Sequence, residues 1–154
     1  MSDGLRELYQ EVILDHGKNP RNFRHPEAAN REAHGNNPMC GDKLAVYLTV
    51  DDKGIIRDAD FVGRGCAIST ASASMMTEIL RGKTEQQAKA LFENFQHNCT
   101  SDAQEPAPEG LADEAERLEM LSGVRQFPMR VKCATLAWHT MMAAMQGEPV
   151  VSTE

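Results

Sequence analysis

Three cysteines and one aspartate constrain this chain more than any other feature of its sequence. They are Cys40 and Asp42 in a Cys-Gly-Asp tripeptide, Cys66 after Gly-Arg-Gly, and Cys133 after Arg-Val-Lys. Each lies at or near an expected boundary between structural elements, where a side chain can be presented to a ligand. Three thiols and one carboxylate form a four-ligand shell suited to a thiophilic metal. Because the sequence has no Cys-x-x-Cys pair, a shared site can form only through the tertiary fold.

Length and composition indicate one globular domain over residues 1–154. The chain has 41% hydrophobic and 25% charged residues, which is ordinary for such a domain. A formal net charge of −7, without a compensating Lys/Arg cluster, argues against nucleic-acid binding. No apolar run approaches the ~20 residues of a membrane span, and the N-terminus lacks the apolar region of a signal peptide. We therefore expect a cytoplasmic protein with no membrane partner, whose four cysteines serve metal binding or catalysis rather than disulfides.

Alternating hydrophobic residues predict a β-hairpin. Its two strands are expected over residues 43–50 and 55–62, joined by an Asp-Asp-Lys-Gly turn. The preceding segment 21–38 is irregular in pattern, although an edge strand near residues 32–34 could be hidden in it. The Gly-rich residues 63–66 are expected to end the second strand.

Segments with helical periodicity surround this hairpin. The expected helices cover residues 5–16, 67–80, 84–96, 111–121 and 128–145. Gly17 is expected to stop the first helix, and Thr84 with Gln87 forms a capping-box pattern. Residues 98–110 are predicted to be a loop and residues 150–154 a frayed tail. This order predicts an α+β fold, with a small antiparallel β-sheet and helices packed on one face.

Two of the cysteines are expected at helix starts, where thiolates are stabilised. Cys66 precedes a helix, so its thiolate faces the positive end of the helix dipole, and Arg64 is close in sequence. Cys133 lies in the first turns of the last helix, beside Arg130 and Lys132, whose charges favour a thiolate. The alternative for each is a small buried hydrophobic residue, because structural cysteines are common in cores.

The tripeptide Cys40-Gly41-Asp42 has its own two interpretations. The glycine allows a backbone conformation that aims both flanking side chains at one point. Alternatively, the tripeptide is only a turn before a strand, with Asp42 bonded to its own backbone. Cys99 has no partner motif and falls in a polar, loop-like segment, so we predict that it has no function.

Taken together, these motifs resemble the U-type iron–sulfur cluster assembly proteins, the family that includes IscU and SufU. The resemblance rests on Cys-Gly-Asp before a hairpin, Gly-x-Gly-Cys-Ala-Ile-Ser before a helix of small residues, and Arg-Val-Lys-Cys-Ala-x-Leu-Ala-Trp in the last helix. The N-terminal segments Leu-Tyr-Gln-Glu-Val-Ile-Leu-Asp-His and Lys-Asn-Pro-Arg-Asn-Phe also look like theirs. The resemblance covers roughly residues 4–147.

Within that family, two details are similar to the SufU branch. Lys132 stands where IscU proteins have a histidine before the third cysteine, and the segment between the second and third cysteines is longer than in IscU. The resemblance implies a SufE/NifU-like fold and a set of supporting cations at Arg64, Arg130 and Lys132. It also implies a metal shell made of Cys40, Asp42, Cys66 and Cys133.

The resemblance implies a role in iron–sulfur cluster biogenesis in one of two modes, and a structural zinc domain outside that role stays open as a third interpretation. In the first, the chain holds Zn²⁺ and Cys40 accepts persulfide sulfur from the cysteine desulfurase SufS, without independent turnover. In the second, the same residues hold a transient [2Fe–2S] cluster for transfer to apo-proteins or other SUF scaffold proteins. In the third, zinc only stabilises an interaction domain. The SufU traits favour the first version.

Overall fold

The computed structural model describes residues 3–152, which form five α-helices, four strands and one short 3-10 turn. The strands are β1 (Arg31–Asn37), β2 (Asp42–Val50), β3 (Ile56–Arg64) and β4 (Val150–Ser152). The helices are α1 (Asp3–Lys18), α2 (Ala67–Leu80), α3 (Glu85–Thr100), α4 (Ala112–Ser122) and α5 (Pro128–Gln146), with the 3-10 turn η1 (Gly123–Gln126) between the last two. No helix in this described part is long and apolar enough to span a membrane.

The strands form one sheet in the order β3-β2-β1-β4, and the predicted α+β fold is confirmed. The pairs β1–β2 and β2–β3 are antiparallel, whereas β4 pairs in parallel with β1 through residues 34–36. The prediction of a frayed tail is therefore wrong for residues 150–152, and residues 153–154 lie outside the described part. The free edge of β1 offers backbone hydrogen bonds that the returning tail can use, and the amide of His34 donates to the carbonyl of Pro149.

Several predicted boundaries move for reasons of tertiary packing. The edge strand expected near residues 32–34 is longer, because all of β1 pairs with β2. Gly17 does not stop α1, which continues to Lys18. A Cβ on Gly17 would lie 3.3 Å from Ala67, so this glycine lets α1 approach the start of α2 closely. Helix α3 also extends through Cys99 to Thr100, into the expected loop, because Cys99 in its last turn is buried in the core.

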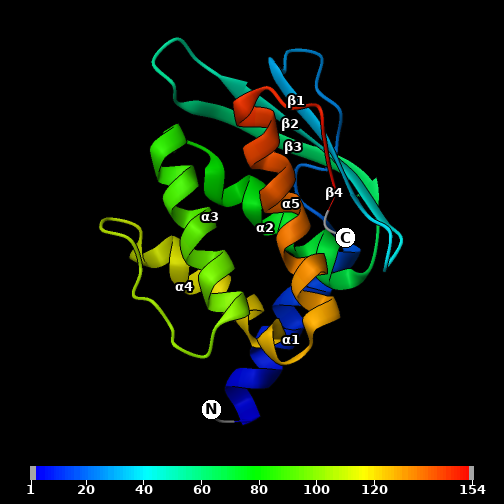
Figure 1. The fold of residues 1–154 in the computed structure, drawn as a ribbon, viewed down its shortest axis with the longest axis vertical. Coiled ribbons are helices and arrows are strands. Elements are labelled where there is room, and N and C mark those ends of the chain that lie inside the picture. The colour runs from blue at the N-terminus through cyan, green and yellow to red at the C-terminus, as the bar shows by residue number, and fades with distance from the viewer. Residues whose placement is uncertain (1–2, 153–154) are drawn as a thin grey trace.

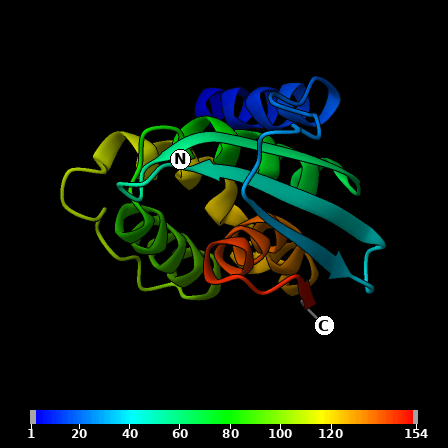
Figure 2. The same ribbon diagram turned by 90° about the horizontal axis from the view of Figure 1, so that it is seen from above.

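Helices α2 and α5 cover one face of the sheet and hold most of the core between them (Figure 1). Helix α1 packs against α2 on the side away from α5, as the view from above makes clear (Figure 2). Helices α3 and α4 pair with each other and extend the helical layer. The local signals agree with this arrangement: the Thr84–Gln87 capping box is present, and Gly147 ends α5 in a left-handed conformation.

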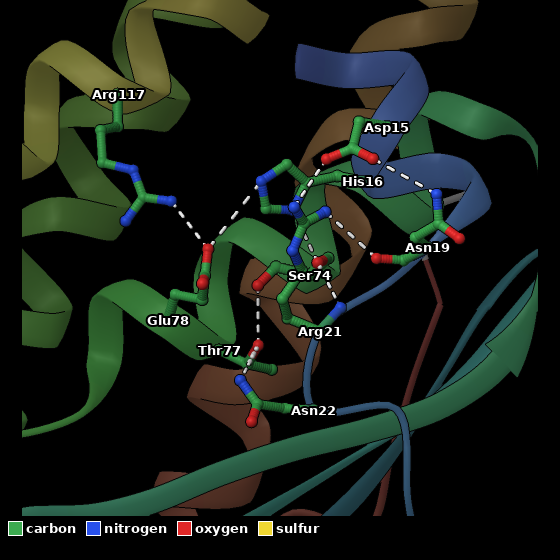
Figure 3. Close-up of polar contacts among 9 residues, drawn as sticks. All are labelled: Asp15, His16, Asn19, Arg21, Asn22, Ser74, Thr77, Glu78 and Arg117. Atoms are coloured by element: carbon green, nitrogen blue, oxygen red, sulfur yellow. Dashed lines mark hydrogen bonds and ion pairs between the residues drawn. The ribbon is translucent and has the colours of Figure 1, made fainter.

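A buried histidine fastens α1 to α2 (Figure 3). His16 Nδ1 lies 2.7 Å from Ser74 Oγ, and its Nε2 lies 3.8 Å from Glu78 Oε1. The amide of Arg21 already donates to Ser74 Oγ, so the arrangement favours the tautomer in which the Ser74 hydroxyl donates to Nδ1. Burial first, and then the charge of Arg21, lowers the pKa of His16, whereas the charge of Glu78 opposes the shift. The native state therefore favours neutral His16.

This arrangement predicts that replacing His16 reduces the acid sensitivity of the fold. The unfolded chain has the ordinary histidine pKa of 6.5 and the folded chain a lower one, so the unfolded state takes up the proton first. The stabilisation from neutral His16 is complete above pH 6.5 and is lost as the pH falls towards the folded pKa. In His16→Gln, urea unfolding at a series of pH values should give a shallower loss of stability, by at most about 1.4 kcal/mol per pH unit. An unchanged pH profile would contradict this role.

Candidate metal centre

The site depends first on how closely α5 lies on β1. Residue 35 of β1 is a glycine, and a Cβ at this position would collide with Thr140 Oγ1 and come within 3.2 Å of Leu136. Alternate residues of a strand share one face, so Asn37 faces the same helix one step further along. Cys133 lies two turns before Thr140 on α5, and Asn37 Nδ2 is 3.8 Å from its Sγ. The close approach at Gly35 thus brings Cys133 to the end of β1.

The turn between β1 and β2 presents Cys40. The amide of Cys40 donates to the carbonyl of Asn37 at 3.3 Å, which closes the turn. Gly41 follows with φ of +71°, a conformation that strongly favours glycine, and Asp42 then begins β2. As a result, the Cys40 thiol is half-buried at the tip of the turn while the Asp42 carboxylate is fully buried beneath it.

Asp42 connects this turn to the start of α2. Its Oδ1 accepts a 2.9 Å hydrogen bond from the amide of Cys66, and its Oδ2 accepts one of 3.3 Å from Asn37 Nδ2. Gly65 makes room for this contact, because a Cβ there would lie 2.5 Å from Asp42 Oδ1. The Asp42 carboxylate therefore bonds to Cys66 and Asn37, and not to its own backbone as the alternative interpretation expected.

The structure brings three of the four predicted ligands together. The Sγ atoms of Cys40 and Cys133 and a carboxylate oxygen of Asp42 all lie within 4.8 Å of one another. Cys66 is their neighbour, but its Sγ accepts a 3.5 Å hydrogen bond from the amide of Ser69 and caps α2. Cys66 is therefore outside the group of three donors, although its backbone amide is bonded to Asp42.

The surroundings of Cys133 disfavour its thiolate form. Burial, and next the neighbouring Cys40, Asp42 and Cys66, raises the pKa of the Cys133 thiol. Hydrogen bonding to Cys133 is in turn the first cause that raises the pKa of Arg130, so this cation lies beside the thiol. A metal that binds through Cys133 has to displace the thiol proton.

Four further residues were singled out in the sequence: three supporting cations and Cys99. Arg130 lies against Cys133. Lys132 is half-buried and Arg64 is exposed, and neither side chain has a hydrogen bond or ion pair among residues 3–152. Cys99 belongs to the hydrophobic core of α3, where burial raises its pKa to about 12. Its expected loop position is wrong, and its lack of function stays a prediction.

Sequence reasoning missed Asn37 as a contributor to the site. Asn37 is fully buried and contacts both Asp42 and Cys133, although the sequence suggested an irregular loop at this point. One available signal was its distance of five residues from Asp42 across a Pro-containing turn, which fits a tight antiparallel hairpin. The register indeed pairs Asn37 with Asp42.

The donor set fits zinc better than a hard cation. Thiolates are soft ligands that zinc and iron–sulfur clusters prefer, whereas calcium and magnesium select oxygen donors. Three cysteines and one aspartate complete the four positions of a closed tetrahedral site. The residues present therefore fit either Zn²⁺ or the iron atoms of a small cluster.

Comparison with known proteins defines the family. The sequence profile of the NifU-like N-terminal domain matches residues 8–134. The chain belongs to this NifU-like family. Over 143 residues it is 39% identical to the iron–sulfur cluster assembly scaffold protein IscU of Streptococcus pyogenes serotype M1, covering 92% of this chain and 85% of that protein. Over 144 residues it is also 39% identical to the zinc-dependent sulfurtransferase SufU of Bacillus subtilis, covering 94% of this chain and 93% of that protein.

A solved structure supports the same relationship for this NifU-like chain. It comes from Fervidobacterium islandicum and is assigned to the SUF system as an iron–sulfur cluster assembly scaffold. The TM-score is 0.78 with 31% sequence identity, and the match covers 94% of this chain and 99% of that one. The predicted resemblance to U-type assembly proteins is therefore confirmed.

The contact between Gly65 and Asp42 gives a direct test of the site in this NifU-like chain. Gly65 has no left-handed backbone, so Gly65→Ala is opposed only by the collision with the buried carboxylate. We expect the free energy of unfolding to fall by about 1–3 kcal/mol, as for other overpacked positions, and zinc binding to weaken. Urea unfolding and a zinc titration measure the two effects. Gly123→Ala is the matched control, because a Cβ at Gly123 meets no atom within 4 Å, and a Gly65 variant that behaves like it would refute the contact.

Proposed function

We propose that this chain acts in iron–sulfur cluster assembly as a zinc-bound sulfur acceptor, with Cys40 taking persulfide sulfur from a cysteine desulfurase of the SufS type. The observation that carries the proposal is the position of Cys40, which is half-buried at a turn tip within 4.8 Å of the buried donors Asp42 and Cys133. The similarity to the zinc-dependent sulfurtransferase SufU supports it. Such thiol chemistry needs a compartment that keeps cysteines reduced, which fits the cytoplasm.

Cys40, Asp42, Cys66 and Cys133 would hold the zinc ion. When bound, zinc would keep the thiol ligands deprotonated and join the β1–β2 turn to the starts of α2 and α5. Cys133 and Asp42 are fully buried and anchored by their elements, so they suit permanent ligands. Cys40 and Cys66 are both half-buried, but Cys66 caps α2 whereas Cys40 lies in the turn, so Cys40 is the ligand proposed to meet the partner, and its departure from the shell would leave the other three in place.

The transfer itself is a thiol–persulfide exchange. The Cys40 thiolate attacks the terminal sulfur of the desulfurase persulfide and forms a new S–S bond. The old S–S bond breaks, and the desulfurase cysteine leaves as a thiolate with the bonding electron pair. Cys40 then carries the persulfide, with no net oxidation or reduction. The Arg130 guanidinium, next to Cys133, would stabilise the negative charge of this persulfide.

Exposed apolar side chains beside the ligands support a protein partner at this site. Met39 precedes Cys40 and is 62% exposed, and Met129, one turn before Cys133, is 54% exposed. Phe127, at the start of α5, is 61% exposed. Large apolar side chains exposed in this way are typical of interaction surfaces. A desulfurase that delivers its persulfide to Cys40 would cover them.

A scaffold function for a [2Fe–2S] cluster is the second candidate. The observation that favours it is the 39% identity to the scaffold protein IscU of Streptococcus pyogenes, which equals the identity to SufU. Thiolates also hold such clusters, and a carboxylate ligand would ease release of the cluster as cargo. A purely structural zinc site is less favoured, because it gives no reason for a partly exposed thiol at the turn tip.

Removal of the Cys40 thiol tests the acceptor role. In Cys40→Ser, stimulation of desulfurase turnover should be abolished, because the thiol proposed to take the sulfur is gone and the other two shell cysteines remain as zinc ligands. Some zinc should stay bound through Asp42, Cys66 and Cys133. The assay measures alanine release from cysteine by the desulfurase with and without the variant, together with zinc content.

Cys99→Ser is the control for this experiment, because it removes a thiol of the buried core. It should stimulate the desulfurase like the wild-type chain. Full stimulation by Cys40→Ser would refute the acceptor role. Loss of both folding and zinc in Cys40→Ser would instead favour the structural role.

The metal content of the purified protein distinguishes the two candidates. We expect about one zinc per chain, as for other four-ligand structural sites, and no acid-labile sulfide in protein purified without oxygen from its own host. Elemental analysis and a sulfide assay provide the measurement. Iron and sulfide in equal amounts, with little zinc, would favour the scaffold function.

A further inference from the structure

We propose that Asn37 is a positioning residue for the metal shell. Its side-chain amide fixes the positions of the Asp42 carboxylate and the Cys133 thiol relative to each other. The inference rests on the proposed metal site and concerns a residue outside the predicted ligand set. Asn37 Nδ2 lies 3.3 Å from Asp42 Oδ2 and 3.8 Å from Cys133 Sγ. One amide group thus bridges two candidate ligands that come from different elements, β2 and α5.

The orientation of this amide follows from the chemistry of its neighbours. A carboxylate is only an acceptor, and a thiolate ligand is also an acceptor, so both need a donor. The NH₂ group of Asn37 supplies the donors, whereas its oxygen would face negative charge on both sides if the amide were turned over. The two N–H bonds of one nitrogen serve both ligands.

The amide is placed here at a cost to the fold. Asn37 is fully buried, and its Oδ1 has no hydrogen-bond partner among the described residues. A buried acceptor without a partner destabilises a protein, and native structures contain few of them. An apolar side chain of the same size would leave no unpaired acceptor at this position. We therefore infer that the hydrogen bonds donated by the Asn37 NH₂ group offset the free-energy cost of its unpaired oxygen.

The benefit of these hydrogen bonds is explained by the way in which Asp42 is held. Of its two oxygens, Oδ1 accepts from the amide of Cys66 and Oδ2 accepts from Asn37. In the proposed shell Asp42 is the fourth donor beside the three cysteines, and its carboxylate oxygen lies within 4.8 Å of the Sγ atoms of Cys40 and Cys133. Hydrogen-bond partners of metal ligands fix the ligand direction and typically contribute a factor of about 10–100 in metal affinity. Asn37 is therefore the partner that directs Asp42 towards the thiols.

The neighbouring Asn36 offers a matched control. It is the same residue type on the same strand, but alternate residues of a strand face opposite sides, and it is only half-buried. Asn36 has no hydrogen bond to a candidate ligand in the described part of the chain, where it lines the outer face of the sheet with Lys43 and Val62.

The test measures metal binding and ligand geometry in Asn37→Leu and Asn37→Ala against Asn36→Ala. Leucine fills the space without a donor, so it separates the lost hydrogen bonds from a cavity. Zinc affinity is measured by competition with a chelator, and Co²⁺ replaces zinc so that its absorption spectrum reports the number and geometry of thiolate ligands. Thermal unfolding of the metal-free chains gives the purely structural effect of each change.

We expect both Asn37 variants to bind zinc about 10–100-fold more weakly and to give an altered Co²⁺ spectrum, while Asn36→Ala matches the wild type in both. Wild-type zinc affinity and an unchanged Co²⁺ spectrum in Asn37→Leu would overturn the inference, whatever happens to its unfolding temperature. A wild-type chain that binds neither Zn²⁺ nor Co²⁺ would overturn the proposed function and, with it, this inference.

Discussion

The close packing of α5 on β1 is the constraint on which the rest of the site depends. Helix and strand approach so closely at Gly35 that any side chain there would collide with Thr140. A helix held further away would leave Cys133 out of reach of the β1–β2 turn. The same packing buries Cys133 completely, and this burial raises the pKa of its thiol. The absence of one side chain therefore affects both where Cys133 lies and how readily its thiol loses a proton.

Asp42 connects the segments of the site to one another through hydrogen bonds. Its carboxylate accepts hydrogen bonds from the backbone of Cys66 and from the side chain of Asn37. The loop before α2 and the end of β1 are thus joined through one buried anion. Buried charges are stable only when they are paired or fully hydrogen-bonded, so the carboxylate holds the ligands in place and in turn depends on them. In this arrangement Cys40 and Cys66 are the half-buried candidate ligands, whereas Asp42 and Cys133 are buried.

Local signals in the sequence predicted most elements of the fold. Helix α2 begins and ends where its pattern of small residues predicted, and the Thr84–Gln87 capping box is present. These features depend on neighbouring residues, so a local pattern contains the information. Strand β4 and the full length of β1 were missed because they depend on backbone pairing between segments far apart in the chain. Gly17 was misread for the same reason, since it serves a contact with Ala67 rather than the end of a helix.

The candidate ligands were found as motifs, but their arrangement was not. Cys40, Asp42 and Cys133 lie together, and Cys66 faces the start of α2 as its position before the helix indicated, but the sequence did not show that this cap would keep Cys66 outside the group of three. Asn37 was missed because an asparagine before a proline is typical of a turn, and only the packing of α5 reveals its contacts.

The same arrangement has a consequence for how the protein is made. Asn37 and Cys133 are separated by 96 residues, and α5 also supplies much of the core. Contacts of such long sequence separation form late, after the cost of closing the intervening loop has been met. A nascent chain on the ribosome has the turn with Cys40 and Asp42 long before α5 emerges. The candidate shell is therefore incomplete throughout most of translation, so a metal that needs all four donors would bind to the finished fold rather than to the growing chain.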